Sequence, residues 1–288
     1  MLPRFEYVKA RGLTDALARL GPSGGQARLL AGGTDLLVDM RERRQAPPIL
    51  IDISEVRELQ EIRADGDAIR IGSGVTVGAV LADAAVGRAF PALTAACRSF
   101  ADYLTRNKAT IGGNLANASP GADLVVPLLA LEASVVLAAA QRERTVPLGE
   151  FVLGPRQTAL RPGELVREIV VPRRAPAGQA YEKLGLKHGG AIAVVSTAVL
   201  VSVANGACAR VRIALGAVAP RPFRAEAAER ALEGRRLDAE AAERAAGLAA
   251  EAASPITDVR GSAEYRRAMV VALVRRGLHA AWGHAAAA

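Results

Sequence analysis

Cysteine, histidine and aromatic residues are all scarce in this sequence, and each scarcity excludes a class of site. The two cysteines, Cys97 and Cys208, are too few for an iron–sulfur cluster or a cysteine-rich zinc site, and they imply no disulfide framework. The three histidines, His188, His279 and His284, have no glutamate or cysteine at metal-ligand spacing. An aromatic share of 3% argues against a nucleic-acid surface built on stacked rings. The sequence therefore predicts neither a metal centre nor a nucleic-acid interface.

Long apolar runs and long blocks of like charge are also absent. The first residues contain no apolar segment typical of a secretory leader, and no apolar run reaches the roughly 18 residues of a membrane span. The net charge of +8 is dispersed, which indicates a solvated surface or a docking face for an acidic partner. We expect a soluble, cytoplasmic protein, and its 288 residues suffice for two domains or three compact subdomains.

Residues 1–60 are expected to form a small α/β unit. The pair Gly32-Gly33 falls between a strand and a helix, with Thr34 or Asp35 available as the helix N-cap. Backbone amides at such a corner can bind an anion. The corner is neither a Rossmann fingerprint nor a Walker A motif, because GxGxxG is absent and no Gly-Lys-Ser/Thr follows. The expected strands are 5–8, 28–31 and 49–53, and the expected helices are 14–20 and 36–43.

Residues 61–175 have the pattern of antiparallel sheet with inserted helices, and the segment 172–178 has the composition of a linker. The expected elements are a hairpin of 69–71 with 75–77, helices at 91–106 and 124–132, a hairpin of 134–138 with 144–147, and a strand at 164–171. In the C-terminal unit, 179–288, Asn205-Gly206 predicts a hairpin. Its expected strands are 192–203 and 207–218, its helices 225–232, 239–253 and 263–279, and its tail 285–288 is expected to fray.

The stretch Thr110–Asp123, TIGGNLANASPGAD, is the strongest candidate binding motif. Gly112 and Gly113 lack Cβ atoms, so they can adopt positive φ and let a ligand approach backbone amides. Asn114 adds a short polar side chain, and Asp123 occupies a helix N-cap position. Exposed amides beside a helix N-terminus favour a phosphate. The alternative is an ordinary glycine-rich turn between two helices.

Taken together, the motifs resemble one family along nearly the whole chain. They are LLAGGTDLL (29–37), TIGGNLANASPGADL (110–124), FxxGPRxT (151–158), PGELVREIVVP (162–172), YEKLG (181–185), IALGAVAP (213–220) and DVRGSAEYRR (258–267). In this order they resemble the flavin subunit of the molybdenum hydroxylases, a family that includes carbon monoxide dehydrogenase and xanthine dehydrogenase. The combination is specific, although no single motif would be.

The resemblance implies an α+β fold with a two-subdomain FAD-binding unit, similar to that of vanillyl-alcohol oxidase relatives, and a C-terminal domain of antiparallel sheet plus helices. FAD would lie between the first two subdomains. The resemblance further implies that the cofactor contacts Leu30, Ala31, Gly32, Gly33, Thr34, Asp35, Leu36, Thr110, Ile111, Gly112, Gly113, Asn114 and Asp123, with Phe100, Val166 and Lys183 near the flavin. Core packing is the alternative for Phe100 and Val166, and a solvated surface position is the alternative for Lys183.

The family also implies partners. A large subunit would carry molybdopterin and oxidise the substrate, a small subunit would carry [2Fe–2S] clusters, and FAD on this chain would pass electrons to an external acceptor, in a dimer of heterotrimers. No histidine precedes His188, so FAD should be bound non-covalently. Carbon monoxide dehydrogenases often have His-Ser where this chain has Thr34-Asp35, which favours an organic substrate. Two alternatives are a free-standing flavin oxidase and an assembly subunit without flavin.

Overall fold

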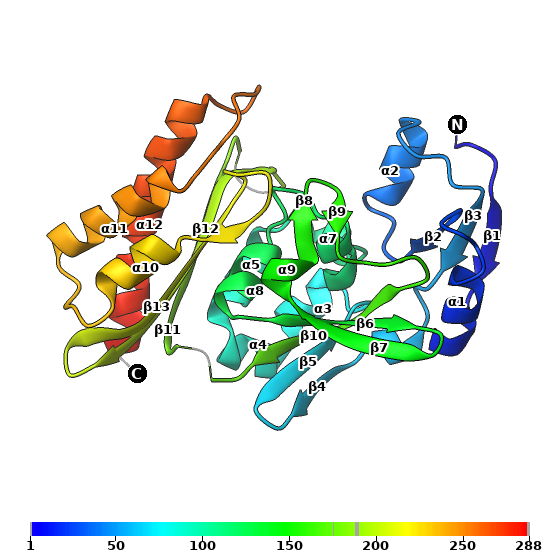
Figure 1. The fold of residues 1–288 in the computed structure, drawn as a ribbon, viewed down its shortest axis with the longest axis horizontal. Coiled ribbons are helices and arrows are strands. Elements are labelled where there is room, and N and C mark those ends of the chain that lie inside the picture. Colours follow the sequence, from blue (N-terminus) through cyan, green and yellow to red (C-terminus); the bar gives the residue numbers. More distant parts are fainter. Residues whose placement is uncertain (1, 175, 188–189, 287–288) are drawn as a thin grey trace.

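The computed structural model describes residues 2–174, 176–187 and 190–286, in which three larger sheets follow one another along the longest axis of the molecule (Figure 1). Position 175 of the expected linker and His188 lie outside the described residues. The mixed helix and sheet content and the C-terminal antiparallel sheet confirm the expected fold class.

The N-terminal sheet is parallel and has the order β1-β3-β2. Its strands are β1 (Glu6–Lys9), β2 (Ala27–Leu30) and β3 (Ile49–Asp52), joined through α1 (Leu13–Leu20) and α2 (Leu36–Arg41). Helix α1 buries Ala16 and Leu17 in the same core as Ile51 of the central strand. The glycine pair 32–33 thus leaves the carboxyl end of an edge strand, as the sequence predicts.

The middle sheet is antiparallel, with the order β4-β5-β10-β6-β7. These strands are β4 (Ile62–Asp65), β5 (Ala68–Gly72), β6 (Ser134–Ala139), β7 (Arg142–Pro147) and β10 (Leu165–Pro172), and the expected β6–β7 hairpin is confirmed. The 3-10 helix η1 (Arg57–Leu59) ends the N-terminal unit, with Leu59 in its core. The further elements of the middle unit are α3 (Val77–Ala82), α4 (Ala84–Ala89), α5 (Pro91–Ser99), α6 (Tyr103–Arg106), α7 (Ile111–Ala116), α8 (Val125–Ala130), α9 (Leu148–Phe151), β8 (Val152–Gly154) and β9 (Gln157–Thr158).

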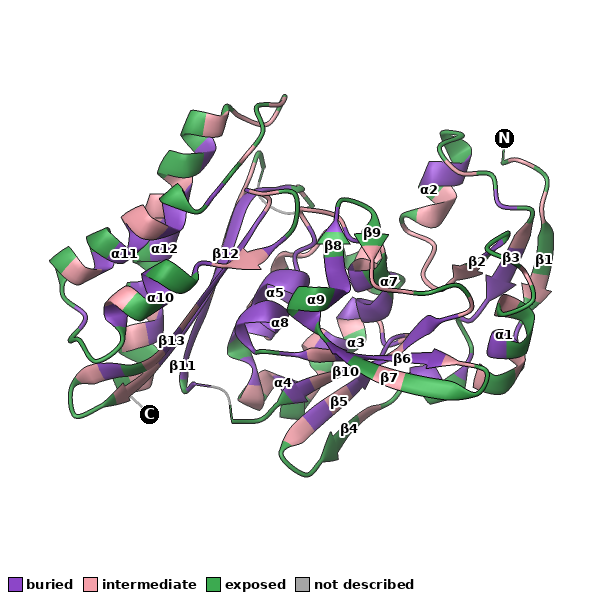
Figure 2. Cartoon of the chain, viewed as in Figure 1, coloured by how far each residue is buried: buried purple, intermediate pink, exposed green. Residues whose placement is uncertain are grey.

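The C-terminal sheet lies between two helical layers (Figure 1). Its order is β11-β12-β13-β14, with β11 (Gly178–Gly185), β12 (Ala193–Ala204), β13 (Ala207–Gly216) and β14 (Phe223–Arg224). Helices α10 (Glu226–Leu232), α11 (Ala239–Glu251) and α12 (Ala263–Ala286) lie on one side, and α5 and α8 of the middle unit contact the sheet from the other. Because both faces are covered, most of β12 is buried on both faces, as Figure 2 shows in purple. At its end Asn205 and Gly206 both have positive φ, which confirms the predicted hairpin.

Two sequence-based expectations were wrong in ways that matter for the site. The helix expected over 91–106 is broken after Ser99, because Phe100 is extended and Ala101 has a φ of 38°. Residues 75–77 do not form the second strand of a hairpin; Thr76 instead caps α3, its side chain accepting a hydrogen bond from the Ala79 amide. The Ile111 amide donates to the Val75 carbonyl, and the Gly112 amide donates to the Ser73 carbonyl. These long-range hydrogen bonds override the local hairpin pattern.

The stretch 110–123 also differs from the expected loop. Gly112 and Gly113 lie inside α7 without positive φ, because Thr110 supplies the N-cap that starts a helix there. Asp123 does not cap α8, whose N-cap residue is Leu124; its carboxylate binds side chains of β11 instead. At the C-terminus, residues 285 and 286 belong to α12, so that part of the tail is not frayed, and 287–288 lie outside the described residues.

Candidate functional site

A pocket of about 880 Å³ opens between the N-terminal and middle units, and both glycine motifs line it. Ten of the sixteen expected cofactor residues are on its walls: Ala31, Gly32, Gly33, Thr34, Asp35, Leu36, Phe100, Thr110, Gly113 and Asn114. These residues come from the β2–α2 corner, from the break after α5 and from the start of α7. The fold therefore brings together two motifs that are far apart in sequence.

The first glycine pair is required for two different reasons. A Cβ on Gly32 would lie 1.9 Å from the Lys108 carbonyl oxygen, so the backbone of this corner touches the segment that leads to Thr110. Gly33 has a φ of 71°, in the left-handed region that favours glycine. Gly32 is therefore needed for the close approach to Lys108, and Gly33 is needed for the backbone conformation of the corner.

In the second motif the two glycines face opposite ways. A Cβ on Gly112 would lie 2.4 Å from Cβ of Ser73, so this residue serves packing within the middle unit. Gly113 is exposed to the pocket, and its amide donates to Thr110 Oγ1 at 3.0 Å. In the next residue, Asn114, the side-chain Oδ1 is buried without a hydrogen-bond partner in the described part of the chain. A buried acceptor of this kind calls for a donor from outside the chain.

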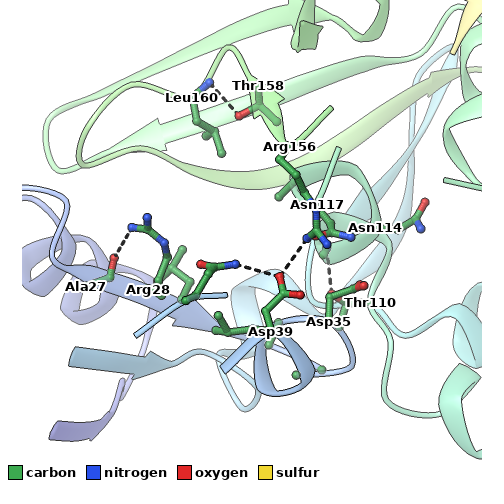
Figure 3. A pocket seen from close by; sticks show the side chains of 18 of the residues that line it. Ala27, Arg28, Asp35, Asp39, Thr110, Asn114, Asn117, Arg156, Thr158 and Leu160 are labelled. Atoms are coloured by element: carbon green, nitrogen blue, oxygen red, sulfur yellow. Dashed lines mark hydrogen bonds and ion pairs between the residues drawn. The ribbon is translucent and has the colours of Figure 1, made fainter. Parts of the chain in front are cut away.

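Arg156 is a pocket residue to which sequence reasoning gave no role, although the FxxGPRxT motif contains it. It has a φ of 61° in the two-residue turn between β8 and β9. Its Nη1 donates to Asp39 Oδ2 of α2 at 3.1 Å and also to Asn117 Oδ1 at the end of α7. Figure 3 shows Asp35, Asp39, Asn117 and Arg156 converging at one place in the pocket. The guanidinium thus joins the two units that form the walls.

The two carboxylates at this place have opposite pKa shifts. Desolvation raises the pKa of Asp35, the charge of Arg156 opposes that effect, and the like charge of Asp39 adds to it. Burial also raises the pKa of Asp39, but hydrogen bonds from Arg44 and Gln45 and the charge of Arg156 outweigh it and hold the pKa below its ordinary value. Asp39 is therefore a fixed anion of the scaffold, whereas Asp35 faces the open pocket.

The far end of the pocket is formed by segments that the sequence analysis did not assign to it. They are residues 20–29 around α1 and β2, and residues 158–164 before β10. Glu164 is buried there, accepts two hydrogen bonds from Arg144 at 2.8 and 2.9 Å, and accepts a third from the Arg161 amide. Residues 162–164 begin the PGELVREIVVP motif, which the sequence analysis had noticed. Its position in the sequence does not show that it lies beside α1.

Six expected residues do not line the pocket: Leu30, Ile111, Gly112, Asp123, Val166 and Lys183. Ile111 is fully buried in α7, and Leu30 is half-buried at the end of β2. Val166 of β10 lies opposite Leu137 of β6 in the main core, so the core-packing alternative describes its position.

Asp123 and Lys183 form a buried ion pair behind the pocket wall. Lys183 Nζ lies 2.6 Å from Asp123 Oδ2, and both side chains are 8% exposed, so the alternative of a solvated surface lysine is wrong. Among the residues that the structure describes, no three His, Cys, Asp or Glu side chains gather as a metal site would, and no helix has the length and apolarity to cross a membrane.

Comparison with known proteins gives matches over the whole length. Residues 3–174 match the family model of the FAD binding domain in molybdopterin dehydrogenase, and residues 179–281 match that of the CO dehydrogenase flavoprotein C-terminal domain. The chain is 39% identical to the carbon monoxide dehydrogenase medium chain of Hydrogenophaga pseudoflava, over 99% of each chain.

Solved structures agree with this match. The chain is similar to one in carbon monoxide dehydrogenase from Hydrogenophaga pseudoflava, with a TM-score of 0.96 at 40% identity, covering 99% of each chain. It is also similar to one in quinoline 2-oxidoreductase from Pseudomonas putida 86, with a TM-score of 0.94 at 31% identity and the same coverage. The two-subdomain unit followed by a C-terminal domain is therefore a fold shared with both structures.

Proposed function

The chain belongs to the FAD-binding medium subunits of the molybdenum hydroxylases, and we propose that it binds FAD non-covalently in the pocket between its first two units. The observation that carries the proposal is the meeting of two glycine motifs from different units on one pocket, where Gly32 touches the backbone of Lys108, just before the second motif. When bound, FAD supplies the redox chemistry, taking up electrons and giving them to an acceptor. The chain itself binds, orients and encloses the cofactor.

The residues present fit such a cofactor. The pocket volume lies toward the upper end of the roughly 300–1,000 Å³ range of small-molecule sites. Gly113 presents a surface without a side chain to the pocket, and the buried Asn114 Oδ1 can accept a hydrogen bond from a ligand. These features support a site for a large ligand such as FAD over a glycine-rich turn that serves only protein packing.

The charges of the pocket also suit a diphosphate. Asp39 is already paired with Arg44 and Arg156, and Glu164 is paired with Arg144. By contrast, neither Arg28 nor Arg161, both on the pocket wall, has an ion-pair partner among the described residues. Two arginines without carboxylate partners can therefore balance phosphate charges.

We assign the cofactor contacts to the ten pocket residues of the sixteen expected. Ile111, Gly112 and Val166 support the walls from buried positions, and Leu30 lies half-buried at the end of β2. Asp123 and Lys183 lie next to the Ser99–Phe100 segment. The domain boundaries 1–60, 61–175 and 179–288 belong to the same proposal, because each range contains one of the three larger sheets, except that β11 begins one residue before the third range, at Gly178.

In the cell we propose a cytoplasmic complex with a large molybdopterin-binding subunit and a small [2Fe–2S] subunit, as a dimer of heterotrimers. Electrons would pass from the clusters to FAD on this chain and on to an external acceptor. Thr34 and Asp35 line the pocket of this chain, so we assign them to the cofactor and not to the choice of substrate. Relatives with carbon monoxide and quinoline in their names share this fold, which indicates that the substrate is selected on the partner chain.

The test begins with the purified full-length chain. It should carry yellow flavin with an oxidised-flavin absorption spectrum, and acid or heat should release all of it into the supernatant. Flavin retained by the precipitate would contradict non-covalent binding, and a chain that takes up no FAD on reconstitution would contradict the function. Affinity purification from the native host, followed by mass spectrometry, should recover a molybdopterin subunit and a [2Fe–2S] subunit.

A further inference from the structure

A buried arginine of the C-terminal unit begins a series of hydrogen bonds that ends at the pocket. Arg266 lies in the first turn of α12 and is 3% exposed. Its Nη2 pairs with Asp258 Oδ1 at 2.6 Å, and its Nη1 donates to the carbonyls of Val194 at 3.0 Å and Ala217 at 2.9 Å. A guanidinium carries five N–H donors in one rigid plane, so it can hold a carboxylate and two backbone carbonyls together. Arg266 therefore fixes the turn that contains Ala217.

This turn, which follows β13, is shaped to meet the middle unit. Ala217 has a φ of 64°, which is costly for a residue with a Cβ and persists where surrounding contacts impose it. Its amide donates to the Pro120 carbonyl at 2.8 Å. A Cβ on Gly216 would lie 2.5 Å from Val126 Cγ2 of α8, so the two units touch here without room for a side chain. Ala217 is thus held through its carbonyl by its own unit and through its amide by the middle unit.

Pro120 belongs to the segment that holds Arg156. Two residues earlier, the Ala118 carbonyl accepts a hydrogen bond from the Arg156 amide at 3.0 Å. Asn117 Oδ1 accepts another from the Arg156 guanidinium (Figure 3). A further backbone hydrogen bond closes residues 119–122 into a turn. Residues 117–120 therefore connect the contact from the C-terminal unit to the side chain that bridges the pocket walls.

The same segment of the C-terminal unit reaches the middle unit a second time. Arg221 donates from Nη1 to the carbonyls of Gly149 at 3.2 Å and Val152 at 3.0 Å. Val152 is the first residue of β8, the strand that leads into the turn with Arg156. The β8–β9 turn is therefore held at two points, at Arg156 itself and at the start of β8.

We propose that Arg266 and Arg221 are positioning residues, which fix the segment 216–221 against the middle unit and thereby set the position of Arg156 in the pocket. Among the described residues, the C-terminal unit contributes none to the pocket walls, so it acts on the cofactor only through such contacts. This role gives a function to the motifs IALGAVAP and DVRGSAEYRR, neither of which reaches the pocket. It rests on the proposed FAD binding.

A purely structural role for Arg266 is the alternative, because the loss of a buried, paired charge destabilises the fold whatever its effect on the pocket. The two roles differ in the residue that carries the effect on FAD. If Arg266 acts through Arg156, its removal has no further effect on FAD affinity once Arg156 is gone. If the two residues act independently, their losses in affinity multiply.

The test is a double-mutant cycle in the full-length chain, with Arg266→Met, Arg156→Met and the two combined. The Kd for FAD is measured from flavin fluorescence, well below the melting temperature of the least stable variant. Each single variant should bind FAD about tenfold more weakly. The double variant should bind it as weakly as Arg156→Met alone. A loss equal to the product of the two single losses, or wild-type affinity in Arg266→Met, would overturn the proposal.

Hydrogen exchange of the apoprotein tests the same contacts without the cofactor. Arg266→Met should speed exchange in residues 154–158 about tenfold, while exchange in β5 of the same unit stays unchanged. Equal acceleration in both segments would indicate general destabilisation and would also overturn the proposal. If the wild type takes up no FAD, the proposed function fails, and the exchange measurement still decides the role of Arg266.

Arg221→Met is taken through the same cycle. Arg221 is exposed, so its removal should leave the fold intact even if Arg266→Met does not fold. It should weaken FAD binding, and this loss should disappear in the Arg156→Met background; a loss that persists there would contradict the role. Arg275→Met is the matched control, since Arg275 lies on α12 like Arg266 but forms an exposed ion pair with Glu243. Its FAD affinity and exchange pattern should equal those of the wild type, and a loss as large as that of Arg266→Met would count against the proposal.

Discussion

Arg156 Nη1 lies 3.1 Å from Asp39 Oδ2, so a side chain from the β8–β9 turn reaches across the pocket to α2 of the N-terminal unit. The same guanidinium donates to Asn117 at the end of α7. One residue therefore bridges the two walls between which the cofactor is proposed to bind.

Arg156→Met is expected to weaken FAD binding about tenfold, because the bridge between the walls is lost and the buried Asp39 loses one of its donors. FAD titration of the apoprotein measures the change. Arg174→Met is the control, since Arg174 pairs with Asp67 on the exposed surface. Equal Kd values for the two variants would show that the bridge does not contribute to binding.

Gly113→Val is expected to give a soluble, folded chain that retains little FAD. The reason is the added volume at an exposed pocket position, where even a Cβ would lie 2.9 Å from Thr110 Oγ1. Gly87→Val provides the control, because Gly87 also lies in a helix and a Cβ there meets no atom within 4 Å. The flavin-to-protein absorbance ratio decides, and normal FAD content in Gly113→Val would exclude this face of α7 from the site.

Gly32→Ala is expected to destabilise the apoprotein as well as to reduce FAD binding. The new Cβ would overlap the Lys108 carbonyl, a backbone atom that cannot rotate away. Forcing an extra methyl group into such a contact costs about 1–3 kcal/mol, which should lower the melting temperature by several degrees. Differential scanning calorimetry of the apoprotein tests this, and an unchanged melting temperature would mean that the fold does not need the close approach of Gly32 to Lys108.

Acid should destabilise the chain partly through Glu164. Hydrogen bonds from Arg144 hold the pKa of this carboxyl below its ordinary value of 4.5. A lowered folded-state pKa stabilises the fold above the unfolded value, and this stabilisation is lost as pH falls through the folded value. Glu164→Gln should therefore cost about 2 kcal/mol at pH 7, with the gap closing below pH ~4.5. Urea unfolding at several pH values measures it; a gap that is constant with pH would contradict the assignment.

The isolated chain should oxidise no substrate of a molybdenum hydroxylase, because its proposed role is confined to FAD and electron transfer. Candidate purine, aldehyde and N-heterocyclic substrates are added anaerobically to the FAD-loaded chain, and the flavin absorbance is followed. Dithionite, which reduces free and bound flavin directly, serves as the positive control. Bleaching by a substrate in the absence of partners would instead support a free-standing oxidase.

The sequence by itself determined the family and most of the elements. Local patterns sufficed where one signal decides the conformation: Asn205-Gly206 made a hairpin, and the strand–Gly-Gly–helix corner at Gly32-Gly33 formed as predicted. The seven motifs in order were enough for the resemblance, because their combination needs no knowledge of distances. Neither the local patterns nor the motif order shows which residues far apart in the sequence lie close together in space.

Only the tertiary structure decided what meets in the pocket. The break after Ser99 cannot be predicted from residues 91–106 alone, because the donor to the Ser99 carbonyl is Lys183, which is 84 positions away in the sequence. Gly112 and Gly113 were expected to act alike, yet Ser73 packs against one and the pocket opens beside the other. Asp123 has the composition of an N-cap but pairs with a lysine sixty positions away. In each case a long-range contact outweighed the local preference of the residue, and long-range contacts are fixed only when the sheets and helices pack.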